Sequence, residues 1–262
     1  MIRRFIGTVF VLLLPVTALA ADATEIMKKS QAAFLYPGID FKARVVMRLT
    51  AKGGQERTRE LTMLRKNYGL PGGNQKYFIY FFKPSDVRDM TFMVYKYPAK
   101  DDDRWLFVPS INLVQRIAAS DSRSSFVGSD FTYEDVSGRD VESDEHKLVK
   151  DEACGGRECH VIESVPKGGT NYSKKVSWID KASLLPMKEE YYDVRGELDR
   201  TFTSDEVMDV EGHPTVTKRT MKNLKSGHRT EAAFEGVKYD VGIKDDFFSE
   251  RYLRNPPKEL IQ

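Results

Sequence analysis

The sequence is poor in the residues that carry most enzyme chemistry. Among its 262 residues are two cysteines and four histidines, and the histidines are scattered at His146, His160, His213 and His228. Neither a Gly-x-Ser-x-Gly elbow nor a His-Glu-x-x-His helix occurs, and the glycine-rich pieces lack a phosphate-loop lysine and serine. We therefore expect no catalytic residue, no cofactor and no metal, and an envelope-lipid hydrolase is the least favoured function class.

Long apolar runs are also lacking, with one exception at the N-terminus. Arg3 and Arg4 precede an apolar stretch over residues 5–14, Pro15 breaks it, and Ala18-Leu19-Ala20 offers the small residues that a signal peptidase reads. The run is too short to span ~30 Å of hydrocarbon comfortably. We predict a signal peptide over residues 1–20, cleaved after Ala20, followed by a single domain over residues 21–262. The residue directly after the cut is Ala21 and not a cysteine, so no lipid anchor is expected.

An excess of charge of one sign is missing as well. The chain carries 41 basic and 39 acidic residues, and loss of Arg3 and Arg4 with the leader leaves 39 of each. A neutral surface of mixed sign gives no electrostatic reason to expect nucleic acid or an anionic membrane as the main partner.

Cys154 and Cys159 are separated by Gly155-Gly156-Arg157-Glu158. Export places both in a compartment where disulfides persist, and the glycine pair permits a sharp turn. A disulfide across a hairpin is the favoured interpretation. A redox motif has two intervening residues, and a zinc site needs further ligands nearby.

The rest of the sequence is dominated by period-two alternation. Asp22 and Glu25 are spaced as an N-cap and its partner, which predicts one amphipathic helix that ends at Tyr36-Pro37-Gly38. Strand-like runs follow, separated mostly by short turns. They cover residues 41–49, 57–66, 76–83, 91–97, 104–108, 113–117, 145–151, 159–165, 173–179, 187–194, 199–207, 214–223 and 230–237.

This pattern predicts an α+β fold that is mainly β, with one antiparallel meander. A sheet this wide must curl, so we expect a half-open β-barrel with short helices over its open side. Its apolar inner face either encloses a cavity for an apolar ligand or is filled completely by aromatic side chains. Periodicity alone favours neither.

Residues 101–138 are the most distinctive stretch. They contain Trp-Leu-Phe-Val-Pro (105–109), Arg116-Ile117 and Gly-Ser-Asp-Phe-Thr-Tyr-Glu-Asp (128–135). Together with Phe82-x-Pro84-x-Asp86-Val87-Arg88 and Phe247-Phe248-x-x-Arg251-Tyr252-Leu253, this resembles the outer membrane lipoprotein-sorting protein family, which is LolA-like. The resemblance covers essentially the whole mature chain.

The resemblance implies a curved antiparallel sheet that binds acyl chains of a lipid or lipoprotein in the periplasm. It also implies an inner-membrane exporter of the RND type, an outer-membrane acceptor, or both, as partners. The leading function is thus a non-enzymatic carrier that shuttles acyl chains between the two membranes. The alternative is a periplasmic sensor that binds mislocalised lipoprotein and a signalling partner.

Two sets of residues are assigned to the site. Gly128, Ser129 and Asp130, followed by Phe131, are expected to start a short lid helix at the cavity mouth, with Ser129 or Asp130 as its cap, Phe131 and Val136 inward, and Glu134 and Asp135 outward. Arg116 is expected to neutralise a head group or to pair with Asp130. The predicted cavity lining is Phe41, Val45, Met47, Leu61, Met63, Ile79, Phe81, Phe92, Val94, Trp105 and Phe107.

Overall fold

The computed structural model describes residues 16–98, 100–168 and 171–261, and in these ranges thirteen strands form one antiparallel sheet. The strands of the first half are β1 (Asp40–Thr50), β2 (Glu56–Tyr68), β3 (Asn74–Lys83), β4 (Thr91–Lys96), β5 (Asp103–Val108) and β6 (Leu113–Ile117). Those of the second half are β7 (Asp144–Cys154), β8 (Arg157–Pro166), β9 (Tyr172–Asp180), β10 (Pro186–Asp193), β11 (Leu198–Val210), β12 (His213–Asn223) and β13 (His228–Tyr239).

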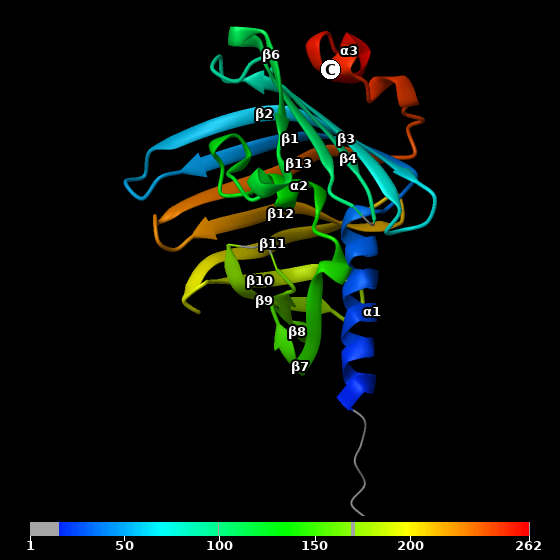
Figure 1. Ribbon diagram of the computed structural model, residues 1–262, viewed down its shortest axis with the longest axis vertical. Coiled ribbons are helices and arrows are strands. Elements are labelled where there is room, and N and C mark those ends of the chain that lie inside the picture. Colours follow the sequence, from blue (N-terminus) through cyan, green and yellow to red (C-terminus); the bar gives the residue numbers. More distant parts are fainter. Residues whose placement is uncertain (1–15, 99, 169–170, 262) are drawn as a thin grey trace, which may run out of the picture.

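Helices are few and mostly short. The α-helices are α1 (Val16–Leu35), α2 (Tyr133–Ser137), α3 (Glu250–Arg254) and α4 (Lys258–Ile261). Single 3-10 turns lie at Pro109–Ile111, Ala119–Asp121, Phe126–Gly128, Val141–Ser143 and Asp245–Phe247. Figure 1 shows the sheet as one curved layer, with α1 and the region around α2 on the same side of it.

The strand order is β6-β5-β4-β3-β2-β1-β13-β12-β11-β10-β9-β8-β7. Each half of the chain is thus a meander, and the two meanders join where β1 pairs with β13. The predicted curved antiparallel sheet with short helices is confirmed. The sheet is not closed, because β6 and β7 pair on one side only within the described residues and form its two edges.

Side-chain alternation explains the two faces of this sheet. In β1 the odd residues from Phe41 to Leu49 are buried, while Arg44 and Arg48 are exposed. The buried set lies on what we call the inner face, the face covered by α1 and by the β6–β7 connection. Because side chains alternate along a strand and paired residues point to the same face, the orientation of β1 determines which residues of the neighbouring strands face inward.

Helix α1 packs on the second half of the inner face. Its Ile26 and Met27 contact Ile162 of β8 and Ile179 of β9 in one buried cluster, and Phe34 lies edge-on to Phe202 of β11 at 6.1 Å between ring centroids. The helix begins earlier than the predicted cap at Asp22, because the alanine-rich residues before it are strong helix formers. The apolar run of the predicted leader, Phe5 to Leu14, lies outside the described residues.

The outer face of β2–β6 is covered by the C-terminal segment. Phe248 and Leu253 pack with Leu64, Phe78 and Met93 in a second buried cluster. The hydroxyl of Thr91 donates to the Leu253 carbonyl at 2.6 Å, which holds α3 against β4. This part of the sheet is therefore buried on both faces. None of the helices in the described ranges is long and apolar enough to cross a membrane.

Candidate functional site

The candidate site is the inner face beneath the β6–β7 connection, residues 118–143, which we call the strap. The strap crosses the sheet rather than following its edge, and Figure 1 shows α2 in front of the central strands. Phe126, Phe131, Tyr133 and Val136 of the strap are buried in the main core cluster of the inner face. The ring of Phe126 lies 5.9 Å from that of Phe81 and 5.4 Å from that of Phe92. The strap thus fills the hollow of the sheet with aromatic side chains.

Capping gives the strap its local shape. Thr132 is the N-cap of α2: its hydroxyl accepts from the Asp135 amide at 3.0 Å, and the Asp135 carboxylate accepts from the Thr132 amide at 2.8 Å. The predicted cap at Ser129 or Asp130 is wrong, because the helix begins after Thr132 and its first amides are satisfied by the reciprocal pair of Thr132 and Asp135. Ser129 instead donates to the carbonyl of Phe126 within the preceding turn.

Polar contacts fasten the strap to strands β11 and β13. Arg200 donates to the Asp130 carbonyl at 3.1 Å and to the Asp135 carboxylate at 2.9 Å. The Asp130 carboxylate accepts from Thr230 at 2.7 Å and contacts His228 at 2.6 Å. On the opposite side Lys96 of β4 donates to the Gly138 carbonyl at 2.7 Å. The strap therefore has apolar contacts beneath it and a small number of polar contacts along its sides.

Two other expectations for the strap need correction. Arg116 forms an exposed ion pair with Asp103 across β5 and β6, far from the contacts of Asp130. Asp135 points toward Arg200 rather than outward, and Glu134 is 3.4 Å from Arg139. These carboxylates turn inward because basic partners from the sheet and the strap neutralise them. Gly128 has a positive φ of 74°, which suits glycine at this turn.

Nine of the eleven predicted lining residues lie together in the buried cluster of the inner face. They are Phe41, Val45, Met47, Leu61, Met63, Ile79, Phe81, Phe92 and Val94. The inward orientation predicted for Trp105 and Phe107 is wrong: both pack on the outer face with the C-terminal segment. Leu106 faces inward in their place, since it pairs with Phe92. The segment Trp105-Leu106-Phe107 is apolar on both faces, so alternation cannot fix its parity.

Three cavities lie beneath α1 and the strap. The first, about 120 Å³, lies between α1, the strap and strands β9–β12. A second of about 50 Å³ lies near Phe41 and Tyr77, and a third of about 20 Å³ lies under Phe126 and Phe131. A polar hollow of about 300 Å³ lies at the β4–β5 side of the strap, beside Lys96, Arg104 and Arg139. An apolar cavity of about 150 Å³ holds a molecule the size of benzene. The inner face is thus nearly filled in this state, and the strap rings occupy the space in which an acyl chain would lie.

The cavity of about 120 Å³ has a charged wall that the sequence prediction missed. Lys175 and Glu189 are 2.9 Å apart, and Tyr172 and Tyr191 stack edge-on beside them at 5.7 Å. Burial opposes the charged form of Lys175, but Glu189 outweighs it and raises the pKa of this lysine. Burial also raises the pKa of Tyr191 well above its ordinary value. Strands β9 to β12 alternate like the others. Some of their inward-facing residues are charged, so the sequence pattern did not identify these residues as part of the cavity wall.

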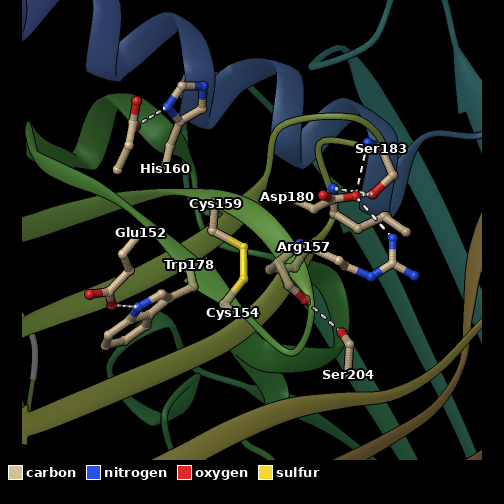
Figure 2. Close-up of a disulfide and its surroundings, with 12 residues drawn as sticks. Glu152, Cys154, Arg157, Cys159, His160, Trp178, Asp180, Ser183 and Ser204 are labelled. Atoms are coloured by element: carbon tan, nitrogen blue, oxygen red, sulfur yellow. Dashed lines mark hydrogen bonds and ion pairs between the residues drawn. A yellow bond between two sulfur atoms is a disulfide. The ribbon is translucent and has the colours of Figure 1, made fainter.

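Within the described residues, no group of three or more His, Cys, Asp or Glu side chains is arranged to hold a metal ion. The Cys154–Cys159 disulfide joins β7 to β8 across their turn, with Cα atoms 6.1 Å apart. Figure 2 shows it between two side-chain contacts: Trp178 donates to Glu152, and Arg157 is 3.3 Å from Asp180. The disulfide lies at the end of the sheet remote from the strap rings.

Comparison with known proteins gives a family for this architecture. A family model described as "Uncharacterized protein" matches residues 73–255. A DUF1329 family protein from Desulfovibrio piger is 28% identical with a TM-score of 0.83, over 90% of this chain and 99% of that one. A putative outer membrane lipoprotein-sorting protein domain from Vibrio parahaemolyticus is also 28% identical, with a TM-score of 0.82 over the same shares.

A LolA superfamily protein from Nitrosomonas europaea shares the fold at 21% identity, with a TM-score of 0.68 over 88% of this chain and 98% of that one. No curated protein matches the chain. These matched structures are covered almost completely.

Proposed function

The chain belongs to the outer membrane lipoprotein-sorting, LolA-like family, and from that premise we propose that it is a non-enzymatic periplasmic carrier of acyl chains. The cargo is a lipid or the lipid part of a lipoprotein, taken up under the strap and shuttled between the inner and outer membranes. An RND-type exporter in the inner membrane is the proposed donor. Cleavage of residues 1–20 would release the carrier into the periplasm.

One observation carries this proposal: the inner face of β1–β4 holds a large apolar cluster whose cover is a separate segment rather than the sheet itself. Phe126, Phe131 and Val136 belong to the strap, while Leu61, Ile79 and Phe92 beneath them belong to the sheet. Displacing the strap exposes this surface and breaks no strand pairing.

The energetics suit a shuttle. Burial stabilises an acyl chain by about 0.8 kcal/mol per methylene relative to water, so a dozen carbons are held firmly in the periplasm. Transfer from this surface to a bilayer is nearly neutral, because both are apolar. A modest rearrangement of the strap is then sufficient to unload the cargo.

The direct test is mass spectrometry of the protein purified from a membrane-containing extract. Acyl chains should copurify with it, and the delipidated protein should bind a fluorescent fatty acid. Protein that is always empty and binds no such probe contradicts the proposal. Copurification of a signalling partner in place of an exporter or acceptor would favour the sensor alternative.

A strap variant sharpens the test. Phe126→Ala removes a ring that a ligand must otherwise displace, so the fluorescent fatty acid should bind more tightly to the variant. The same change should lower the free energy of unfolding by about 3–5 kcal/mol, as for other buried phenylalanines. Phe247→Ala, on the outer face, is the matched control and should leave fatty-acid binding unchanged. Weaker binding to Phe126→Ala would show that the ring contacts the ligand rather than blocking it.

A further inference from the structure

Arg219 of β12 is a cation set in a cage of phenylalanine rings. Its guanidinium carbon lies 4.5 Å from the ring centroid of Phe234 and 5.5 Å from those of Phe34 and Phe131. The three rings come from β13, α1 and the strap, so each layer around the inner face contributes one. All three distances fall within the range of cation–π attraction.

The cage does not satisfy the hydrogen-bonding capacity of this side chain. Across the described ranges Arg219 forms no ion pair, and its Nε is buried without a hydrogen-bond partner. The nearby carboxylate of Asp135 is already bound by Arg200 at 2.9 Å. A guanidinium carries five N–H donors, and ring faces replace only part of what water provides. Burial lowers the pKa of Arg219 to about 10, although Asp135 and Tyr77 act in the opposite direction.

Other basic residues of the inner face differ from Arg219 in having partners. Arg104 pairs with Asp102 at 2.6 Å, Lys175 with Glu189 at 2.9 Å, and Arg65 donates to the Pro37 carbonyl. The Nε atoms of Arg65 and Arg104 are also buried without a hydrogen-bond partner, but another guanidinium nitrogen of each of these residues is bound. Arg59 likewise has a buried nitrogen without a partner, but it lines none of the three cavities beneath α1 and the strap. Arg219 is partly exposed, but its Nε is shielded from solvent, and an unpaired charge set among apolar side chains is costly and calls for an explanation beyond packing.

The position of Arg219 supplies that explanation. It lines all three inner cavities, of about 120, 50 and 20 Å³. On one side is the charged wall of β9–β11. On the other is the apolar surface of Met47, Leu61 and Met63, over which the strap lies. Arg219 therefore sits at the boundary between a polar and an apolar compartment, where the head of an amphiphile would lie if its tail followed the apolar side.

From this geometry we infer that the cargo is an anionic amphiphile whose carboxylate or phosphate binds Arg219 while its acyl chain lies along β1–β3 under the strap. The inference rests on the proposed carrier function and names its ligand class. When Phe131 moves away with the strap, Arg219 loses one ring and gains an oxyanion, which accepts the N–H bonds that the rings leave unmade.

The test uses matched pairs of anionic and neutral probes with the delipidated protein. Dansyl-labelled undecanoate is compared with its methyl ester by direct fluorescence titration. Palmitoyl lysophosphatidate is compared with monopalmitoylglycerol by displacement of the labelled undecanoate. The first pair reports on a carboxylate and the second on a phosphate. We expect the anionic member of at least one pair to bind roughly tenfold or more tightly, as for a charge-assisted contact in a desolvated site.

The variant Arg219→Met should abolish this preference, so that both members of a pair bind equally, and Arg219→Lys should retain part of it. Lys222→Met is the control: it removes a cation from the exposed face of the same strand and should keep the full preference. Thermal unfolding should show Arg219→Met folded and about as stable as the parent, because the change removes an unpaired, partly buried charge and keeps an apolar side chain of similar length.

Three outcomes separate the ideas. An anion preference that persists in folded Arg219→Met overturns the assignment to this residue. Equal binding of anionic and neutral probes to the parent protein overturns the ligand class and leaves the carrier function standing. Failure of every probe to bind contradicts the carrier function itself.

Discussion

Asp135 has two roles at the scale of a single residue: its carboxylate closes the capping box of α2 and pairs with Arg200 of β11. In Asp135→Asn the amide oxygen can still accept from the Thr132 amide, but the ion pair is lost and Arg200 is left partly buried without a counter-charge. We expect the free energy of unfolding to fall by about 3 kcal/mol. Urea denaturation measures this, with the exposed Asp121→Asn of the same strap as control. A loss no larger than that of the control would assign Asp135 to the cap alone.

His146 gives the protein a dependence of stability on pH. Burial lowers the pKa of His146 from its ordinary 6.5, although its bond to the Val141 carbonyl opposes this. Nε2 lies 2.8 Å from that carbonyl and must donate, so Nδ1, 2.8 Å from Ser164 Oγ, accepts in the neutral ring. The unfolded chain then binds the proton more readily than the folded one. The contribution to stability is complete above about pH 6.5 and is lost as the pH falls below it.

The corresponding prediction concerns His146→Gln, which keeps polar atoms at this position but does not titrate. From pH 7 to pH 5 the urea midpoint of the parent should fall more steeply than that of the variant. Parallel midpoints over this range would mean that His146 is protonated at the same pH in the folded and unfolded chains.

The hairpin of β7 and β8 shows what one covalent link contributes at the scale of an element. The loop closed by Cys154 and Cys159 is short, so loop-closure entropy predicts a stabilisation of only about 2 kcal/mol. Cys154→Ala/Cys159→Ala should lose about this much in chemical denaturation and should bind the fluorescent fatty acid as the parent does. Weaker binding in a folded double variant would couple this edge of the sheet to the site.

The elements also show where sequence reasoning holds and where it stops. Each of the thirteen strands overlaps a predicted run, although most extend one to three residues beyond it. Alternation locates most of them, because a half-buried strand places apolar side chains at every second position. The predicted inward orientation was wrong for Trp105 and Phe107. The C-terminal segment covers the outer face there, so the strand is apolar on both faces and alternation does not distinguish them. The α2 cap was misplaced because Ser129, Asp130 and Thr132 are all good caps, and the contact between Asp130 and Thr230 decides among them.

The charged wall of the cavity was not predictable for a different reason. Lys175, Glu189 and Arg200 occupy inner positions of their strands, and in an isolated strand such residues indicate the solvent face. They are turned inward because strands from β9 to β11, adjacent in the sheet, bring opposite charges together. Pairing across strands is a property of the assembled sheet, so no single segment carries the signal.

At the scale of the whole molecule, the paired strands of the open sheet hold the fold together, while the strap covers the surface proposed to bind cargo. The three cavities beneath α1 and the strap, of about 120, 50 and 20 Å³, are too small for an acyl chain, so cargo must displace the strap to reach the apolar surface. The sheet need not open, since the strap joins it through side chains and a few hydrogen bonds rather than by strand pairing. The strap and the central strands should therefore change their hydrogen-exchange protection in different directions when a fatty acid is bound.

Hydrogen exchange can follow both regions in the delipidated and the fatty-acid-loaded protein. On loading, amides of residues 119–137 should exchange faster, because Phe126 and Phe131 leave the core. Amides of β1, β2, β12 and β13 should keep or increase their protection, since their pairing persists and cargo covers them. Phe126→Ala should show part of the change in the strap before any ligand is added. Greater protection of the strap in loaded protein would mean that it closes over the cargo, and the cavity would then have to grow by movement of α1 instead.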